Sequence, residues 1–200
     1  MNWDLIPILD FVAKSSGRIR IIRRATGLLA PSIPHLPEFV RNEPIHGESF
    51  GGKAANLNAA LRALAPGWRW ALILDADSLV TSDVLKQFAR IAVSAGNAGI
   101  RVGFIQGALW SCDPGDSVLE RALCLSEDVY YRQYAWLKIV SGVIPNWGHG
   151  MLVSRDAWES TNGFPLEISE DLAWANCLAV DGGFVNYYTT VATLEAKPVS

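Results

Sequence analysis

The amino-acid sequence predicts a single α/β domain over residues 1–200, with a mixed, mainly parallel sheet flanked by helices. Short apolar runs typical of buried strands alternate along the chain with longer segments whose apolar residues repeat at helical spacing. Half of the residues are hydrophobic and 18% are charged, which is a globular composition. A chain of 200 residues is also long enough to bury a sizeable core.

The first part of the chain is expected to contain two helices and two strands. An apolar helical face over residues 3–16 precedes a strand at 18–23, and the proline-rich stretch 27–50 is expected to be irregular. A helix over about 52–64 is stopped by a Pro-Gly pair, and a strand that ends at Asp75 follows it.

The second part continues the alternation of helices and strands. Apolar periodicity defines the helices, and β-branched or aromatic runs define the strands. The expected helices cover about 82–95, 117–140, 155–161 and 169–180, and the expected strands cover 102–106, 150–153, 184–188 and 190–194.

Charge and composition exclude several classes of protein. A net charge of −3 and a pI near 5.6 give no basic surface, which argues against a nucleic-acid partner. No apolar run reaches the length needed to span a bilayer, and the N-terminus lacks a signal-peptide layout. Cys112, Cys124 and Cys177 are odd in number and lack metal-ligand spacing, so we expect reduced, buried cysteines in a cytoplasmic chain.

The run from Trp70 to Ser78 contains two carboxylates, Asp75 and Asp77, at the end of an apolar strand. Side chains alternate along a strand, so the two carboxylates would project the same way if extended geometry continues. Ligands of open α/β sheets bind at the carboxyl ends of strands, and paired carboxylates there suit Mg²⁺ or Mn²⁺. The alternative is a strand-to-helix turn in which Ser78 or Asp77 caps the next helix.

A glycine-rich segment precedes this strand and ends at Lys53. The segment from Gly47 to Lys53 satisfies the pattern G-x-x-x-x-G-K of a phosphate-binding loop. Ala54 replaces the hydroxyl residue that should ligate Mg²⁺, and the preceding segment is not an apolar strand, so this interpretation is disfavoured. The same residues predict a helix start whose free amides suit an anion, with Lys53 adding a charge for a diphosphate; an ordinary surface lysine is the alternative.

The tripeptide Ser-Glu-Asp occurs twice. The copy at 126–128 lies inside the long helical pattern, where acidic residues are expected to form a solvated face. In the copy at 169–171, Ser169 is a good N-cap residue, and Glu170 and Asp171 follow in the first turn. An ionised Asp171 at the rim of a cleft could act as a general base, although capping alone would also explain these residues.

A glycine-flanked turn, Trp147-Gly148-His149-Gly150, leads into the strand at 150–153. Its glycines permit a ligand to approach the backbone closely, and Trp147 offers an apolar face. His149 could donate to a hydroxyl group, although a lone histidine is more often structural.

Taken in order, these motifs resemble those of family 2 glycosyltransferases, the GT-A-fold group that includes cellulose synthase-like and other β-glycan synthases. The resemblance covers about residues 18–195, and each motif is weak alone but specific in combination. It rests on Lys53–Asn58, the Asp-Ala-Asp of 75–77, the turn 148–150, Arg155–Trp158, Asn162–Pro165 and Ser169–Leu172.

The resemblance implies metal-assisted, inverting transfer of a sugar from a nucleotide sugar, with UDP expected as the nucleotide, to a carbohydrate or lipid-linked acceptor. Mg²⁺ or Mn²⁺ is the implied cofactor. By position, Asp75 and Asp77 would hold the ion and the diphosphate, Lys53 and Asn56 would contact the donor, Trp147, Gly148, His149 and Gly150 would line the acceptor site, and Asp171 would be the base with Glu170 beside it.

The sequence departs from the family's pattern at both ends. The family's first two nucleotide-binding strands and its later Q-x-x-R-W motif are not found, so the sequence is expected to be a truncated domain, associated with a membrane only through regions outside it. The alternative function is a non-catalytic, GT-A-like module for binding or assembly.

Overall fold

The computed structural model describes residues 21–22, 40–41, 52–64, 67–75, 78–112 and 117–196. The chain divides into two compact units, residues 1–64 and 65–200. In the first unit, β1 (Ile21–Ile22) pairs in parallel with β2 (Val40–Arg41), and α2 (Gly52–Ala63) confirms the helix expected there. The helix predicted at 3–16 lies outside the described residues.

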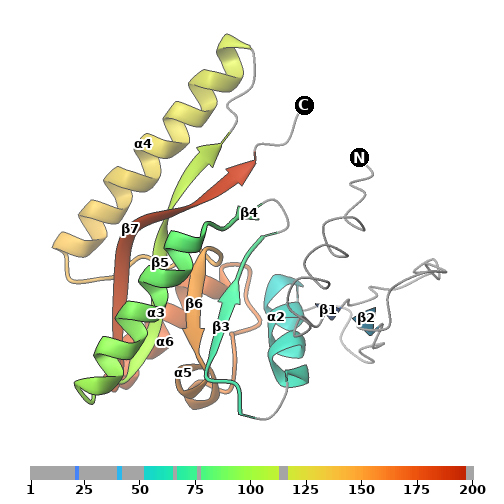
Figure 1. The fold of residues 1–200 in the computed structure, drawn as a ribbon, viewed down its shortest axis with the longest axis vertical. Coiled ribbons are helices and arrows are strands. Elements are labelled where there is room, and N and C mark those ends of the chain that lie inside the picture. The colour runs from blue at the N-terminus through green and yellow to red at the C-terminus, as the bar shows by residue number, and fades with distance from the viewer. Residues whose placement is uncertain are drawn as a thin grey trace. The chain divides into compact units, whose positions relative to one another are not determined.

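The second unit is built on a mixed sheet of five strands in the order β3-β6-β5-β7-β4 (Figure 1). β6 is antiparallel to both β3 and β5, β5 is parallel to β7, and β4 is antiparallel to β7. Three strands therefore run one way and two the other, so the sheet is mixed as expected. Only the β5–β7 pairing of this sheet is parallel, so the prediction that the sheet is mainly parallel is wrong. The strands are β3 (Trp70–Ile73), β4 (Ser78–Leu79), β5 (Val102–Cys112), β6 (Met151–Ser154) and β7 (Val185–Ala196).

Four helices of the second unit are described: α3 (Ser82–Asn97), α4 (Val118–Val140), α5 (Arg155–Ser160) and α6 (Glu170–Asp181). Side-chain oxygens of Thr81, Ser117 and Ser154 accept backbone N–H groups at the starts of α3, α4 and α5. Ser169 precedes α6 but forms no side-chain cap, because its backbone (φ −109°, ψ 65°) lacks the extended geometry of the other caps. The prediction that Ser169 caps this helix is therefore wrong.

The core lies on both faces of the sheet. On one face, α3 places its buried Val84 and Phe88 in a cluster with Val102 and Ile105 of β5. Adjacent residues of a strand point to opposite faces, so Phe104 lies on the other face, where its ring is 5.8 Å from that of Trp174 in α6. α3 and α6 therefore cover the two faces, which stabilises the sheet by apolar burial on each side.

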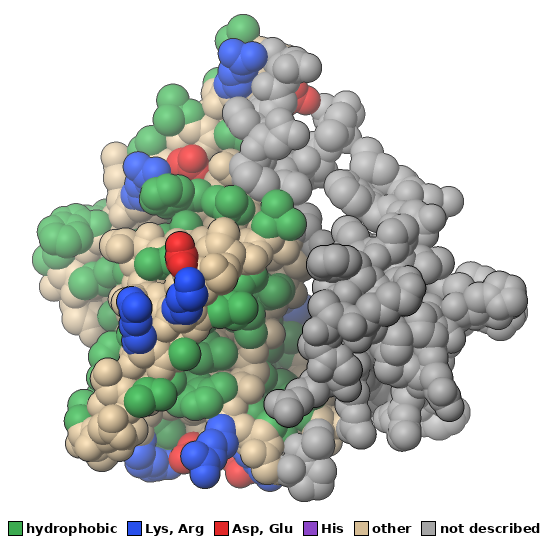
Figure 2. Space-filling view, viewed as in Figure 1, with side chains coloured by type: hydrophobic (Ala, Val, Ile, Leu, Met, Phe, Trp, Pro, Cys, Tyr) green, Lys and Arg blue, Asp and Glu red, His purple; other side chains and the backbone are tan. Residues whose placement is uncertain are grey.

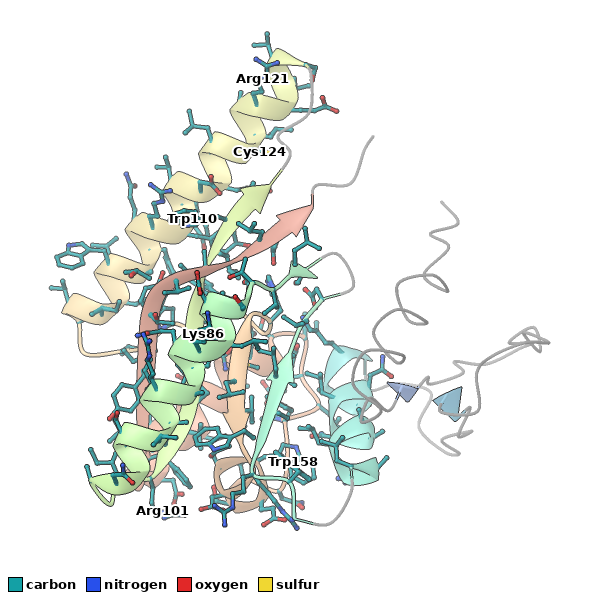
Figure 3. The ribbon with its side chains drawn as sticks, in the orientation of Figure 1. Lys86, Arg101, Trp110, Arg121, Cys124 and Trp158 are labelled. Atoms are coloured by element: carbon teal, nitrogen blue, oxygen red, sulfur yellow. The ribbon has the colours of Figure 1, made fainter. Side chains whose placement is uncertain are left out.

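Aromatic and charged side chains also mark the two ends of the sheet (Figure 3). Arg101, just before β5, and Trp158 of α5 lie near one end, and Trp110 lies along β5 toward the other. Trp158 is buried and its ring centroid is 6.0 Å from that of Trp68, whereas Trp110 is exposed.

The strand lengths differ from the prediction in three places. β3 ends at Ile73 rather than at Asp75, because the chain turns there. β5 runs to Cys112 rather than ending at residue 106, because its pairing with β7 continues past the glycine at 107. The two closing strands predicted at 184–188 and 190–194 form one strand, β7. Gly107 pairs with Thr189 and Ala108 with Ala192, so β7 bulges between the two halves and keeps the same neighbour.

The segment after β3 is a turn followed by a short strand. The backbone N–H of Ser78 donates to the carbonyl of Asp75 (3.0 Å), and the backbone N–H of Asp75 donates to Ser78 Oγ (3.2 Å). β4 comes next and α3 is capped by Thr81, so the alternative in which Ser78 caps the helix is wrong. Asp77 lies outside the described residues.

Two further expectations can be compared with the described residues. Cys124 is buried as expected, but Cys177 is exposed because it lies on the outer side of α6, away from the buried Trp174 and Leu178. The side chain of Cys112 is not described. Within the described ranges, no helix has the length and apolar character required to span a membrane.

Candidate active site

The pairing register brings two loop segments to one end of the sheet. Ile73, the last residue of β3, pairs with Met151, the first residue of β6, and Met151 pairs with Gln106 of β5. The turn that contains Asp75 follows β3 at this point, and the glycine turn of residues 147–150 directly precedes β6 there. The two segments are therefore neighbours although they are far apart in the sequence.

Gln106 holds the glycine turn in place. Its side chain is fully buried, and Nε2 donates to the carbonyls of His149 (2.9 Å), Gly150 (3.2 Å) and Gly107 (3.0 Å). Its Oε1 accepts the backbone N–H of Trp147 (3.0 Å). Without these hydrogen bonds, backbone N–H and C=O groups of this irregular segment would be buried unpaired, which would destabilise the folded state. A polar residue inside an apolar strand was the sequence signal for this role.

Both glycines of the turn have backbone conformations that disfavour side chains. Gly148 has φ 74° and Gly150 has φ 60°. A Cβ at Gly150 would lie 2.5 Å from Thr193 Oγ1 and 2.8 Å from Leu109 Cδ2. A Cβ at Gly148 would lie 3.3 Å from both Cβ and Oδ2 of Asp171. The Asp171 side chain therefore lies directly against the backbone of the glycine turn.

Asp171 comes from the first turn of α6, where free backbone N–H groups favour negative charge. Its Oδ1 accepts the backbone N–H of Leu172 (2.8 Å), while Oδ2 faces Gly148. The side chain of Asp171 is half-buried, and the neighbouring Glu170 is buried. One carboxylate oxygen is therefore anchored and the other is directed toward the turn.

His149 connects the glycine turn to Asp75. The residue is buried, and its Nδ1 lies 3.8 Å from Asp75 Oδ2 and 2.5 Å from Glu195 Oε1 of β7. Asp75 is the more open partner, with 38% of its side chain exposed against 14% for Glu195. Asp171 therefore lies against Gly148, and Asp75 lies near the next residue, His149.

Aromatic rings of α4 lie beside the same turn. The ring centroids of Tyr131 and Tyr134 lie 5.1 Å and 5.4 Å from that of Trp147. Burial raises the pKa of the Tyr131 hydroxyl, and the negative charges of Glu195 and Asp75 raise it further. Tyr131 therefore stays a neutral hydroxyl at physiological pH and is close enough to both carboxylates to interact with them.

The family model described as "Glycosyltransferase like family 2" matches residues 41–200. The chain belongs to this family. Comparison with curated proteins found no match. The five-stranded mixed sheet flanked by helices is consistent with the GT-A-like fold expected of a family 2 glycosyltransferase.

The residues predicted for the glycosyltransferase site are placed to different extents. The structure brings together Asp75, Trp147, Gly148, His149, Gly150, Glu170 and Asp171. Asp77 lies outside the described residues, and Lys53 and Asn56 lie on α2 in the other unit. Gln106, Tyr131 and Glu195 join the site without having been predicted.

The Ser-Glu-Asp copy at residues 126–128 is partly buried rather than part of a solvated face. Asp128 Oδ1 accepts the backbone N–H of Ser111 at the end of β5 (2.9 Å), and Glu127 Oε2 is buried. The prediction of a solvated acidic face is therefore wrong for these two residues. Asp128 attaches α4 to the end of β5.

The carboxylate at Asp75 fits the hard divalent cation that the fold family implies. Among the described residues, no three His, Cys, Asp or Glu side chains are grouped to hold a metal ion. Mg²⁺ and Mn²⁺ do not need such a cage, because they accept one or two carboxylates and complete their shell with water and phosphate oxygens. The half-exposed Asp75, two residues before Asp77, suits this open type of site.

Proposed function

We propose that this glycosyltransferase domain transfers a sugar from a UDP-sugar to a hydroxyl group of a glycan or lipid-linked acceptor, with inversion at the anomeric carbon. The observation that carries the proposal is the position of Asp171 Oδ2 against Gly148, one residue from the histidine that approaches Asp75. A base and a diphosphate-binding carboxylate near the same turn are the two groups that a single displacement needs.

In this proposal Asp171 acts as the general base. It accepts the proton of the acceptor hydroxyl while the acceptor oxygen forms a bond to the anomeric carbon of the donor. The bond from that carbon to the diphosphate oxygen breaks, and its electron pair leaves with UDP. Attack and departure occur on opposite faces of the carbon, so the configuration inverts.

Asp75 and Asp77 would hold a Mg²⁺ or Mn²⁺ ion, which supplies positive charge to stabilise the leaving diphosphate. Lys53 and Asn56 are proposed to contact the donor, and Glu170 supports Asp171 at the start of α6. The glycine turn from Trp147 to Gly150 would receive the acceptor. Gly148, next to the base, has no side chain that would block the approach of a ligand to the backbone.

The test is the substitution Asp171→Asn in the full chain, with Asp181→Asn as the matched control. Both residues are aspartates of α6, but Asp181 is exposed at its other end. We expect Asp171→Asn to lower the transfer rate by about 10²–10⁴-fold, the usual contribution of a general base, and to leave UDP affinity close to unchanged. Asp181→Asn should behave like the unmodified chain.

Turnover that survives Asp171→Asn would remove this residue from the mechanism. The donors to be compared are UDP-glucose, UDP-GlcNAc and GDP-mannose, each with Mn²⁺. If the unmodified chain binds a nucleotide sugar but transfers nothing from any of them, the alternative of a non-catalytic binding module gains support and the proposed activity is rejected.

A further inference from the structure

Glu195 of β7 is a largely buried carboxylate at the candidate site that the sequence motifs do not identify. Only 14% of its side chain is exposed. A carboxylate in this environment is costly unless a polar group compensates for its lost hydration. The nearest such group is the imidazole of His149, whose side chain is 10% exposed.

The backbone of Glu195 is in register with the turn that presents Asp75. Glu195 pairs with Ser78 of β4, and Ser78 closes that turn through its backbone N–H and its Oγ. On its other side, Glu195 pairs with Ser111 of β5. Glu195 therefore has a paired strand on each side, with β4 and the Asp75 turn on one side and β5 on the other.

The side chain of Glu195 reaches the other turn of the site. His149 Nδ1 and Glu195 Oε1 are 2.5 Å apart, and among the described residues neither of these buried atoms has a hydrogen bond of regular geometry. The distance from Nδ1 to Asp75 Oδ2 is 3.8 Å, which is too long for a hydrogen bond. Of the two carboxylates, only Glu195 therefore lies within hydrogen-bond distance of Nδ1.

We propose that Glu195 is a positioning residue for the transfer reaction, which holds the His149 imidazole with its proton on Nδ1 and so fixes the glycine turn relative to the Asp75 turn. The inference rests on the proposed function for its catalytic consequence. A carboxylate that accepts one ring N–H of a histidine sets both the tautomer and the orientation of the ring. Nε2 is then left as an acceptor.

The consequence for the reaction is geometric. Asp75 is proposed to face the donor diphosphate, and Gly148, beside His149, faces the base Asp171. Glu195 spans the two turns, so its removal is expected to misalign donor and acceptor without removing either binding site. Misplacement of reacting groups by about 1 Å can lower a rate by about 10²-fold.

The kinetic test compares Glu195→Gln, His149→Ala and the double variant, with Glu167→Gln as a control at an exposed glutamate. We expect Glu195→Gln to lower kcat by about tenfold or more, with UDP affinity nearly unchanged. His149→Ala should lower kcat at least as much. In the double variant the loss should match that of His149→Ala alone, because Glu195 acts through this histidine. Additive losses would overturn the inference.

A spectroscopic readout keeps this inference separate from the proposed activity. Long-range ¹H–¹⁵N correlation NMR of ¹⁵N-histidine-labelled chain, assigned by the loss of the His149 signals in His149→Ala, reports which ring nitrogen carries the proton. We expect the Nδ1–H form in the unmodified chain and a shift toward mixed tautomers in Glu195→Gln. A His149 ring protonated only on Nε2 would overturn the inference, whether or not the chain transfers sugar and whether or not the variants fold.

Discussion

At the scale of single residues, the candidate site depends on groups that permit close approach. Gly148 leaves room for the Asp171 carboxylate, and Gly150 leaves room for Thr193 and Leu109. The Gln106 side chain then fixes the carbonyls of the turn from inside the sheet. The chemistry proposed for Asp171 and His149 therefore relies on neighbours that take no part in it.

The substitution Gly150→Ala is expected to destabilise the chain, since it places a Cβ 2.5 Å from Thr193 Oγ1 at a residue with φ 60°. Steric strain and the unfavourable backbone conformation together should lower the free energy of unfolding by about 2–4 kcal/mol. Urea denaturation measures the change.

Gly96→Ala is the matched control for this prediction. Gly96 lies inside α3, and a Cβ there meets nothing within 4 Å. We expect Gly96→Ala to stabilise the chain by about 0.5–1 kcal/mol, because alanine is the better helix former. Equal effects of the two substitutions would show that the turn is not sterically constrained.

The site residues that the sequence identified are those that belong to local motifs. Asp75 follows the end of a strand, His149 lies between two glycines, and Asp171 lies at the start of a helix. These local patterns are visible in the sequence and identify the three residues as candidates. Gln106 lies inside β5 and Glu195 lies near the end of β7 instead. Their roles depend on pairing partners across the sheet, which one sequence does not specify.

At the scale of elements, helices were easier to predict than strands. α4 was expected at 117–140 and begins at Val118, because Ser117 and Glu120 form a capping box that the local sequence encodes. The bulge in β7 is different, since it follows from the shift of register against β5 rather than from any local break. Strand ends are decided by the neighbouring strand, and helix ends by nearby side chains.

The capping box of α4 makes a pH-dependent contribution to stability. Hydrogen bonds from the Ser117 side chain and backbone lower the pKa of Glu120. A carboxyl group whose pKa is lower in the folded state stabilises it above the unfolded pKa, which is about 4.3, and this stabilisation is lost as the pH falls through the folded pKa. The unmodified chain should therefore be more stable than Glu120→Gln at neutral pH.

Urea denaturation at a series of pH values from neutral into the acidic range tests this prediction, because the stabilisation is lost as the pH falls through the folded pKa of Glu120. The difference in free energy of unfolding between the unmodified chain and Glu120→Gln should shrink toward zero on acidification. Glu167→Gln, at an exposed glutamate outside any capping box, serves as the control. A difference that stays constant with pH would mean that the charge of Glu120 does not support the helix.

At the scale of the whole molecule, much apolar surface remains exposed. Figure 2 shows hydrophobic side chains among charged ones on the visible face of the described residues. On α4 the exposed Leu119, Leu123, Tyr130 and Leu137 share one side of the helix, judged by their spacing. These side chains add nothing to stability by burial, so α4 stabilises this unit through its other side, where Cys124 and Ala135 are buried.

Ligand binding should raise the stability of the whole chain if the proposed donor site exists. At a UDP concentration of about 100 Kd with saturating Mn²⁺, binding stabilises the native state by about 2.7 kcal/mol. For a chain of 200 residues this predicts a rise in Tm of about 5–11 °C.

At the same UDP concentration the rise should largely disappear with EDTA and in Asp77→Ala, because the metal links the diphosphate to the carboxylates. Asp181→Ala, at an exposed aspartate, should keep the full rise. An equal rise with and without metal would refute the assignment of Asp75 and Asp77 as its ligands.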